Sequence, residues 1–424
     1  MSNVAVDLFT SETLIDPYAA YATLRDEAPV YPIPAMNLHV VTRYDLIREA
    51  IKDTETFSSR FEAFMEATRQ AGLASASEQA RAKLAEIGKE MIPLPATMLT
   101  LDQPEHTQYR SLVSKLFTGS EVKRAEPQVQ AVIDSALTQM LDATVSGAVD
   151  FVEHFAFPVP LRIIADRLGI PEADRDFFDE AATAAASTLR MAPLTDEQQV
   201  RRAQLALDLQ RLLCRLIDER RAEPRTDMIT ILANSKLEQE DRPLTYGEAI
   251  SILNQFLVAG HETTASTFGW GMLALCQNPG LEAELRGNEK LIRTFVEEVL
   301  RIESPVQGLP RLVTRDTELG GYPLKAGEMV MLRFGAGNRD ERQFDGPEQV
   351  NIHREKAGMQ LAFGSGVHHC IGAPLARQEL NLGFATLLDH LENLRLDSTA
   401  ELPQAEPSFI LRNLPSLKIQ YERR

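Results

Sequence analysis

The sequence is poor in cysteine and has no apolar run long enough to cross a membrane. Its three cysteines in 424 residues, Cys214, Cys276 and Cys370, do not provide the disulfide framework of a small secreted protein. The N-terminal residues show no basic segment followed by an apolar stretch, so we expect neither a signal peptide nor a membrane anchor. These absences favour a cytoplasmic protein.

Positive charge is also scarce, because 44 Lys and Arg face 61 Asp and Glu and leave a net charge of −17. Such an acidic balance opposes binding to nucleic acid or to an anionic membrane surface. The sequence has no Gly-x-Gly-x-x-Gly after a strand and no cysteine set for an iron–sulfur cluster, so we expect no fused reductase. The remaining composition, 44% hydrophobic and 25% charged, is that of a globular protein with a large core.

The most distinctive stretch is residues 363–372, Phe-Gly-Ser-Gly-Val-His-His-Cys-Ile-Gly, which leads into a helical pattern. Its glycines let the backbone approach a flat group closely, and the start of a helix favours a thiolate at Cys370. A lone cysteine is more often a buried apolar residue, and His368-His369-Cys370 could also be a zinc or copper tract. Zinc ligands are usually about two to four residues apart, however, and no second ligand pair follows nearby.

As a whole, the string resembles the haem-binding signature of the cytochrome P-450 family, Phe-Gly-x-Gly-x-His-x-Cys-x-Gly. The resemblance implies that the Cys370 thiolate is the protein's ligand to the iron of haem b. The other residues that it places around the haem in this loop are Phe363, Gly364, Gly366, His368 and Gly372.

A second motif lies in a long helix that a capping box at Thr245 and Glu248 starts and that we expect to end near Gln277. Its centre reads Ala-Gly-His-Glu-Thr-Thr over residues 259–264, and Gly and Thr are unfavourable in a helix interior. One interpretation is a kink at which a threonine bonds back to a carbonyl group. The block also resembles the family's acid-threonine motif, at which the helix opens.

That resemblance implies that Glu262 and Thr263 deliver protons to the oxygen bound at the distal face of the haem. Ala259 and Gly260 would leave room there for oxygen and substrate. They count among the residues expected to contact the cofactor.

His106 and Arg110 are four residues apart and share one face of an expected helix. Such a pair is usually solvated on a surface. The resemblance implies instead that the two side chains hold the haem propionates as cationic donors, with Arg311 as a further donor.

Three charged residues resemble a structural network of the family. Glu298 and Arg301 match its Glu-x-x-Arg motif, and Arg354 would be the third member. We expect this network to hold the loop that carries Cys370, because removing one partner would strand a buried charge.

The resemblance further implies a lid over residues 58–89, a mobile roof over residues 179–194 and a final turn at residues 407–411. The pocket residues that it predicts are Leu94, Met98, Leu189, Met191, Ala259, Val306, Leu309, Phe409 and Ile410.

The expected fold is mainly α with small β-sheets, the cytochrome P-450 fold, with haem between the long central helix and the helix that follows Cys370. We expect one domain over residues 1–424, with a small N-terminal β-rich part and a large α-rich part. The pattern predicts strands near 30–33 and 38–42, a helix over 44–52, and a helix from Cys370 to about Leu394.

The implied function is that of a monooxygenase, which uses O2 to hydroxylate or epoxidise a small hydrophobic molecule. Electrons would come from NAD(P)H through a separate ferredoxin and ferredoxin reductase, docked near Cys370 by Lys115 and Arg377, and we expect a monomer. Two alternatives are a peroxygenase driven by H2O2 and a non-catalytic haem sensor or carrier. The Glu262–Thr263 pair disfavours both, because neither needs this route for protons.

Overall fold

The computed structural model describes residues 5–144, 147–186, 194–237 and 239–424. The chain divides into two compact units, which are described separately. Unit 1 comprises residues 1–57, 119–162 and 261–424, and unit 2 comprises residues 58–118 and 163–260. In the described residues the chain is mainly helical with four small sheets, which confirms the predicted fold class.

A five-stranded sheet in the order β1-β2-β10-β7-β3 forms one part of unit 1. Its strands are β1 (Val30–Ile33), β2 (Leu38–Val41), β3 (Phe57–Ser58), β7 (Leu309–Val313) and β10 (Met329–Leu332). β2 pairs antiparallel with β1 and parallel with β10, so a segment some 290 residues away completes the N-terminal sheet. The strands predicted near residues 30–33 and 38–42 are confirmed.

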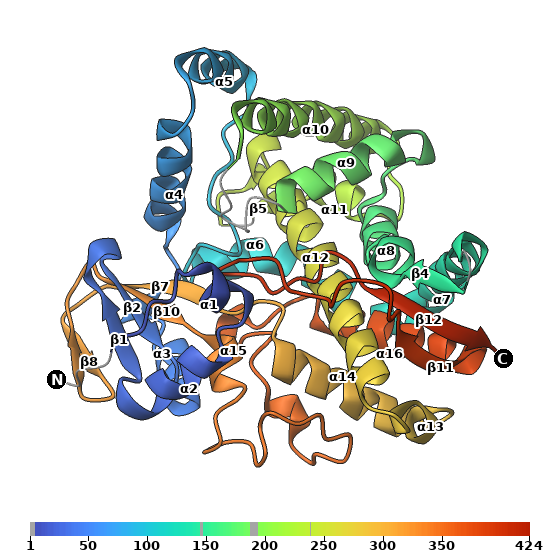
Figure 1. Cartoon of the computed structure of the whole chain (residues 1–424). Coiled ribbons are helices and arrows are strands. Elements are labelled where there is room, and N and C mark those ends of the chain that lie inside the picture. Colours follow the sequence, from blue (N-terminus) through green and yellow to red (C-terminus); the bar gives the residue numbers. More distant parts are fainter. Residues whose placement is uncertain (1–4, 145–146, 187–193, 238) are drawn as a thin grey trace. The chain divides into compact units, whose positions relative to one another are not determined.

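Helix α3 (Tyr44–Lys52) lies against this sheet (Figure 1). Its apolar residues recur on one face, and Ile47 and Ile51 are buried with Val330 and Leu332 of β10. The helix predicted over residues 44–52 is confirmed. It also brings Tyr44, Arg48 and Ile51 to the segment that carries Cys370.

The remaining regular elements of unit 1 are mostly helices. They are α1 (Ser11–Ile15), α2 (Tyr18–Glu27), α7 (Gly119–Ala143), α13 (Leu281–Leu285), α14 (Glu289–Glu303), α15 (Phe334–Gly337) and α16 (Ala373–His390), with the hairpin β8 (Thr317–Leu319) and β9 (Tyr322–Leu324).

Helix α16 ends earlier than the sequence pattern predicts. Residues 391–396 form β11 (Leu391–Leu396), which pairs with β12 (Lys418–Arg423), and β12 pairs in turn with β4 (Ala148–Asp150). The prediction of helix to about Leu394 is therefore wrong, because pairing with a distant strand overrides the local helical pattern.

Unit 2 is helical apart from the hairpin β5 (Lys236–Leu237) and β6 (Arg242–Pro243). Its helices are α4 (Glu62–Ala74), α5 (Glu78–Glu90), α6 (Glu105–Ser114), α9 (Arg175–Ala186), α10 (Asp196–Ala222) and α11 (Met228–Asn234), while α8 (Pro158–Leu168) begins in unit 1. The segment expected as a lid thus contains α4 and α5. None of the helices in the described part of the chain has the length and apolarity needed to span a bilayer.

Helix α12 (Tyr246–Gln277) passes through both units. Its predicted capping box is present: the Thr245 N–H donates to the Glu248 carboxylate over 2.8 Å, and the Glu248 N–H donates to the Thr245 hydroxyl over 3.2 Å. The helix is unbroken through residues 259–264, so the opening expected there is not seen.

Candidate active site

Cys370 lies at the end of a tight loop, just before helix α16. The Cys370 N–H donates to the Phe363 carbonyl over 2.9 Å, which closes the loop on itself. Gly364 and Gly366 have positive φ angles of 66° and 69°, a region that residues with a Cβ atom rarely adopt. The predicted glycines are therefore needed for the turn, and the loop delivers one sulfur ligand near a helix N-terminus.

Helix α3 supports this loop from within unit 1. The Arg48 guanidinium donates to the Ser365 hydroxyl over 2.6 Å, and the Tyr44 hydroxyl donates to the Met359 carbonyl over 2.8 Å. A Cβ atom at Gly366 would lie 3.2 Å from Ile51, so the loop backbone approaches the helix closely. No local pattern predicts this support, because these residues are more than 300 positions from the loop.

Arg377 in α16 is bound within unit 1. Its guanidinium donates to the Glu297 carboxylate of α14 over 2.5 and 3.1 Å, and its Cζ atom lies 4.5 Å from the Phe363 ring centroid. Gln360 also donates to Glu297, over 3.1 Å. Arg377 therefore links the start of the Cys370 loop to α14, a contact that the sequence analysis missed.

The predicted charge network has its partners in contact. Arg301 donates to Glu298 over 2.7 and 3.0 Å, and Arg354 Nε donates to the same carboxylate over 2.8 Å. Glu298 and Arg301 are fully buried, and Arg301 also donates to the carbonyls of Asn338 and Pro347. Because these carbonyls belong to the coil before the Cys370 loop, the network ties that coil to α14.

Glu262 and Thr263 lie on α12 in unit 1. Glu262 is 5% exposed, and its Oε1 atom accepts a hydrogen bond from Asn413 Nδ2 over 2.6 Å. Thr263 is half-buried, and its carbonyl accepts a hydrogen bond from the Thr267 hydroxyl over 2.8 Å. Thr267 lies outside the motif at residues 259–264, so this bond back to a carbonyl one turn earlier does not test the interpretation given for that motif.

Residues predicted to line the pocket meet where two segments of unit 1 run side by side. Val306 forms a β-bridge with Leu411, and the Gln307 N–H donates to the Ile410 carbonyl over 2.7 Å. Val306 and Leu309 are half-buried and pack against the core of the five-stranded sheet.

Phe409 differs from this group. Its ring lies 4.8 Å from that of Phe9 and 4.4 Å from the Arg333 guanidinium carbon, measured to the Phe409 ring centroid. Phe409 therefore packs against the N-terminal segment through Phe9, and its place in the pocket stays a prediction. Arg311 in β7 is 6% exposed, and its Nη1 atom donates to the Pro310 carbonyl over 2.7 Å.

In unit 2, His106 and Arg110 lie one turn apart on α6, as predicted. Burial lowers the pKa of His106, and the Arg110 charge lowers it further, while Asp102 acts in the opposite direction. The lowered pKa favours the neutral imidazole of His106, and the role of the pair as donors to the haem carboxylates stays a prediction. A neutral imidazole still offers one N–H group to a carboxylate.

Gly260 and Ala259 occupy the unit 2 part of α12, and the two differ in what they face. A Cβ atom at Gly260 would lie 2.9 Å from Ile164 Cγ1 of α8. The absent side chain therefore makes room for Ile164 and not, as predicted, for oxygen and substrate. Ala259 is exposed although Phe256 and Leu257 before it are buried.

The other predicted pocket residues of unit 2 differ from one another in how exposed they are. Met98 is buried, whereas Leu94 is 41% exposed. Leu189 and Met191 lie outside the described residues.

The three cysteines differ in their surroundings, and these bear on what Cys370 can bind. Burial raises the pKa of Cys214, and burial with the nearby Glu282 raises the pKa of Cys276 to about 12, so both are neutral thiols. Among the described residues, no group of three or more His, Cys, Asp or Glu side chains could hold a metal ion. A single sulfur donor in a glycine-rich loop does not fit the zinc or copper alternative. It fits an iron whose other ligands come from a porphyrin.

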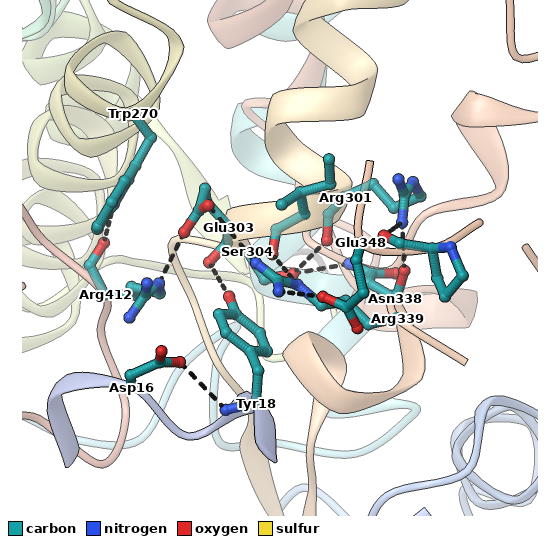
Figure 2. Close-up of polar contacts among 12 residues, drawn as sticks. Asp16, Tyr18, Trp270, Arg301, Glu303, Ser304, Asn338, Arg339, Glu348 and Arg412 are labelled. Atoms are coloured by element: carbon teal, nitrogen blue, oxygen red, sulfur yellow. Dashed lines mark hydrogen bonds and ion pairs between the residues drawn. The ribbon is translucent and has the colours of Figure 1, made fainter. Parts of the chain in front are cut away.

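A buried polar network joins the N-terminal, central and C-terminal segments of unit 1 (Figure 2). Arg412 donates to Glu303 over 2.8 Å, and Arg339 forms an ion pair with Glu303 at 3.5 Å. Tyr18 lies between these two guanidinium groups, with its ring centroid 4.9 and 3.3 Å from their carbon atoms. Burial raises the pKa of Tyr18 to about 12, so its hydroxyl stays protonated and donates to the Glu303 carbonyl.

Comparison with known proteins gives one consistent answer. The family model described as Cytochrome P450 matches residues 31–421. The cytochrome P450 monooxygenase PikC of Streptomyces venezuelae is 32% identical over 413 residues, which cover 96% of this chain and 92% of PikC. The vitamin D(3) 25-hydroxylase of Pseudonocardia autotrophica is 32% identical over 396 residues, or 92% of this chain and 90% of that protein. The solved structure of cytochrome P450 CYP109Q5 from Chondromyces apiculatus matches with a TM-score of 0.81 at 28% identity, covering 99% of this chain and 98% of that one.

Proposed function

The chain belongs to the cytochrome P450 family of haem-thiolate monooxygenases, and from this premise we propose a role for each residue of the candidate site. Cys370 supplies the thiolate ligand of the haem iron. The observation that carries this assignment is the closed glycine loop, in which the Cys370 N–H bonds to the Phe363 carbonyl over 2.9 Å directly before α16. Phe363, Gly364, Gly366, His368 and Gly372 shape the same loop.

The residues that hold the haem carboxylates are His106, Arg110 and Arg311. Arg110 and Arg311 contribute positive charge, and His106 contributes a neutral N–H donor because its pKa is lowered. When bound, haem with a thiolate ligand supplies an electron-rich iron at which the O–O bond of O2 can be cleaved.

Glu262 and Thr263 deliver protons to the distal side of the haem, where O2 would bind. Glu262 is buried and held in place by Asn413, and Thr263 follows it directly on α12. Proton transfer by a positioned group typically contributes about 10²–10⁴ in rate. Ala259 is exposed and lies one turn before Thr263, so its small side chain leaves space beside the reacting oxygen.

The substrate is a small hydrophobic molecule, and the product is an alcohol or an epoxide with water as the second product. Support for hydroxylation comes from the relative that is named as a vitamin D(3) 25-hydroxylase. Val306, Leu309 and Ile410 line the pocket where the β-bridge between Val306 and Leu411 joins two segments.

Electrons come from NAD(P)H through a separate ferredoxin and ferredoxin reductase. Lys115 is exposed and suits docking of an acidic ferredoxin. Arg377 is already bound to Glu297 and Phe363, so its part in reduction is to support the Cys370 loop.

The decisive experiment is the spectrum of the reduced protein with carbon monoxide, for the wild type and for Cys370→His. We expect the absorbance maximum of a thiolate complex in the wild type only, since histidine gives a different ligand field. Cys276→Ala is the matched control and should leave the spectrum unchanged. A thiolate spectrum that survives in Cys370→His would refute the assignment. Optical titration with steroids, fatty acids, terpenoids and polyketides would then identify the substrate class.

A further inference from the structure

Asn413, near the C-terminus, is bonded to the glutamate that we assign to proton delivery. Its Nδ2 atom donates to Glu262 Oε1 over 2.6 Å, although the two residues are 151 positions apart. Both side chains are buried, at 7% and 5% exposure. A short hydrogen bond to a buried carboxyl group restricts the rotamer of that group strongly.

The backbone beside Asn413 is fixed on the same face of α12. Glu262, Ser266 and Trp270 follow each other at intervals of four residues, so they lie on one face of the helix. The Ser266 hydroxyl and the Trp270 ring N–H both donate to the Arg412 carbonyl, the latter over 3.1 Å. Three successive turns of α12 therefore bind two consecutive residues, Arg412 and Asn413.

Arg412 is itself anchored: Figure 2 shows its side chain bonded to Glu303 and its carbonyl group bonded to Trp270. It donates to the Glu303 carboxylate over 2.8 Å and to the Ile15 carbonyl over 2.6 Å. Its guanidinium carbon also lies 4.5 Å from the Trp270 ring centroid. The backbone at Asn413 is therefore held in place independently of Glu262, and so is the position of the Asn413 amide.

We propose that Asn413 is a positioning residue that orients the Glu262 carboxyl group for proton transfer. The proposal rests on the role proposed above for Glu262. An amide suits this task because it can donate to a carboxylate through Nδ2 and accept from a neutral carboxylic acid through Oδ1. Asn413 Oδ1 is buried and makes no hydrogen bond among the described residues, so Glu262 is the group that sets the orientation of the amide.

The test compares Asn413→Leu with Ser266→Ala in the haem-loaded protein. Leucine has the same branched skeleton of four heavy atoms as asparagine but no donor, whereas Ser266→Ala loosens the same segment without touching Glu262. With ferredoxin, ferredoxin reductase and no added substrate, two rates are measured: NADPH oxidation in oxygen, and reduction under carbon monoxide. The first rate needs proton delivery and the second does not.

For Asn413→Leu we expect NADPH oxidation in oxygen to fall about tenfold and its solvent isotope effect to rise, with reduction under carbon monoxide unchanged. Ser266→Ala should keep both rates. Normal NADPH oxidation in Asn413→Leu, or equal losses of both rates in the two variants, would overturn the proposal.

A second measurement does not depend on activity. In a double-mutant cycle of Asn413→Leu and Glu262→Leu followed by urea unfolding, the two changes should be coupled by about tenfold in the unfolding equilibrium constant. Additive effects would contradict the proposed contact. Glu262→Gln separates the two levels of inference: if it oxidises NADPH normally, the role proposed for Glu262 is wrong, and if it is slow while Asn413→Leu is normal, only the role of Asn413 is wrong.

Discussion

The guanidinium carbon of Arg377 lies 4.5 Å from the centroid of the Phe363 ring, while Glu297 accepts two hydrogen bonds from the same guanidinium. Phe363 opens the loop that ends in Cys370, and Glu297 precedes the buried Glu298 on α14. An arginine stacked and paired in this way is already engaged within its own chain. Its guanidinium therefore stabilises the Cys370 loop and is not free to pair with a partner protein.

Replacing Arg377 by Leu should lower the free energy of unfolding by about 1–3 kcal/mol, because Glu297 loses two charge-assisted hydrogen bonds. It should also slow reduction of the haem by a factor that does not depend on salt. Lys115→Glu, at an exposed residue, should slow reduction strongly at low salt and only weakly at high salt. Stopped-flow reduction at several ionic strengths checks both, and the same salt dependence in the two variants would restore a docking role for Arg377.

Replacing Arg354 by Ala should lower the free energy of unfolding by about 3–5 kcal/mol, since removing a partner leaves part of the fully buried Glu298 charge uncompensated. The control is Arg315→Ala, whose side chain is 60% exposed and should change stability by less than about 1 kcal/mol. Urea denaturation measures both. Equal small effects would mean that the network does not stabilise the loop.

Lowering the pH should reduce the stability of unit 2, because Glu248 becomes protonated. Burial raises the pKa of Glu248, but hydrogen bonds from Arg242, Thr245 and Tyr109 lower it by a larger amount. The net result is a pKa of about 2 instead of the ordinary 4.5. Because the folded pKa is the lower one, this stabilisation is complete above pH 4.5 and is lost as the pH falls towards 2.

Glu248→Gln should therefore cost about 1–3 kcal/mol of stability at pH 7. It should also flatten the dependence of stability on pH in that acid range relative to the wild type. Urea unfolding at intervals of pH gives the comparison, and parallel curves for the two proteins would exclude this contribution of Glu248.

Gly260→Ala should destabilise the protein by about 1–3 kcal/mol, although alanine is the better helix former. The added Cβ atom would lie 2.9 Å from Ile164 Cγ1 and 3.0 Å from Ile164 Cδ1. Combining Gly260→Ala with Ile164→Ala should recover stability relative to Ile164→Ala alone, because the new methyl group fills the space that the isoleucine leaves. Thermal unfolding of the four proteins tests this, and simple additivity would argue against the packing explanation.

Several features of this protein were predictable from short stretches of sequence. The capping box at Thr245 and Glu248, the strands at residues 30–33 and 38–41 and the glycine turn before Cys370 all depend on neighbours within a few residues. Local hydrogen bonds and backbone preferences depend on residues that are close in sequence, so the sequence alone determined these features. The ordered motifs also identified the family, which the comparisons confirmed.

Other features depended on residues far apart in the chain. Gly260 faces Ile164, residues 391–396 pair with the C-terminal strand instead of extending α16, and Asn413 reaches Glu262 across 151 positions. Each of these is decided by which surfaces meet when the chain packs, and no local preference encodes that. The sequence by itself determined which residues carry the chemistry, and only the tertiary structure decided which residues hold them in place.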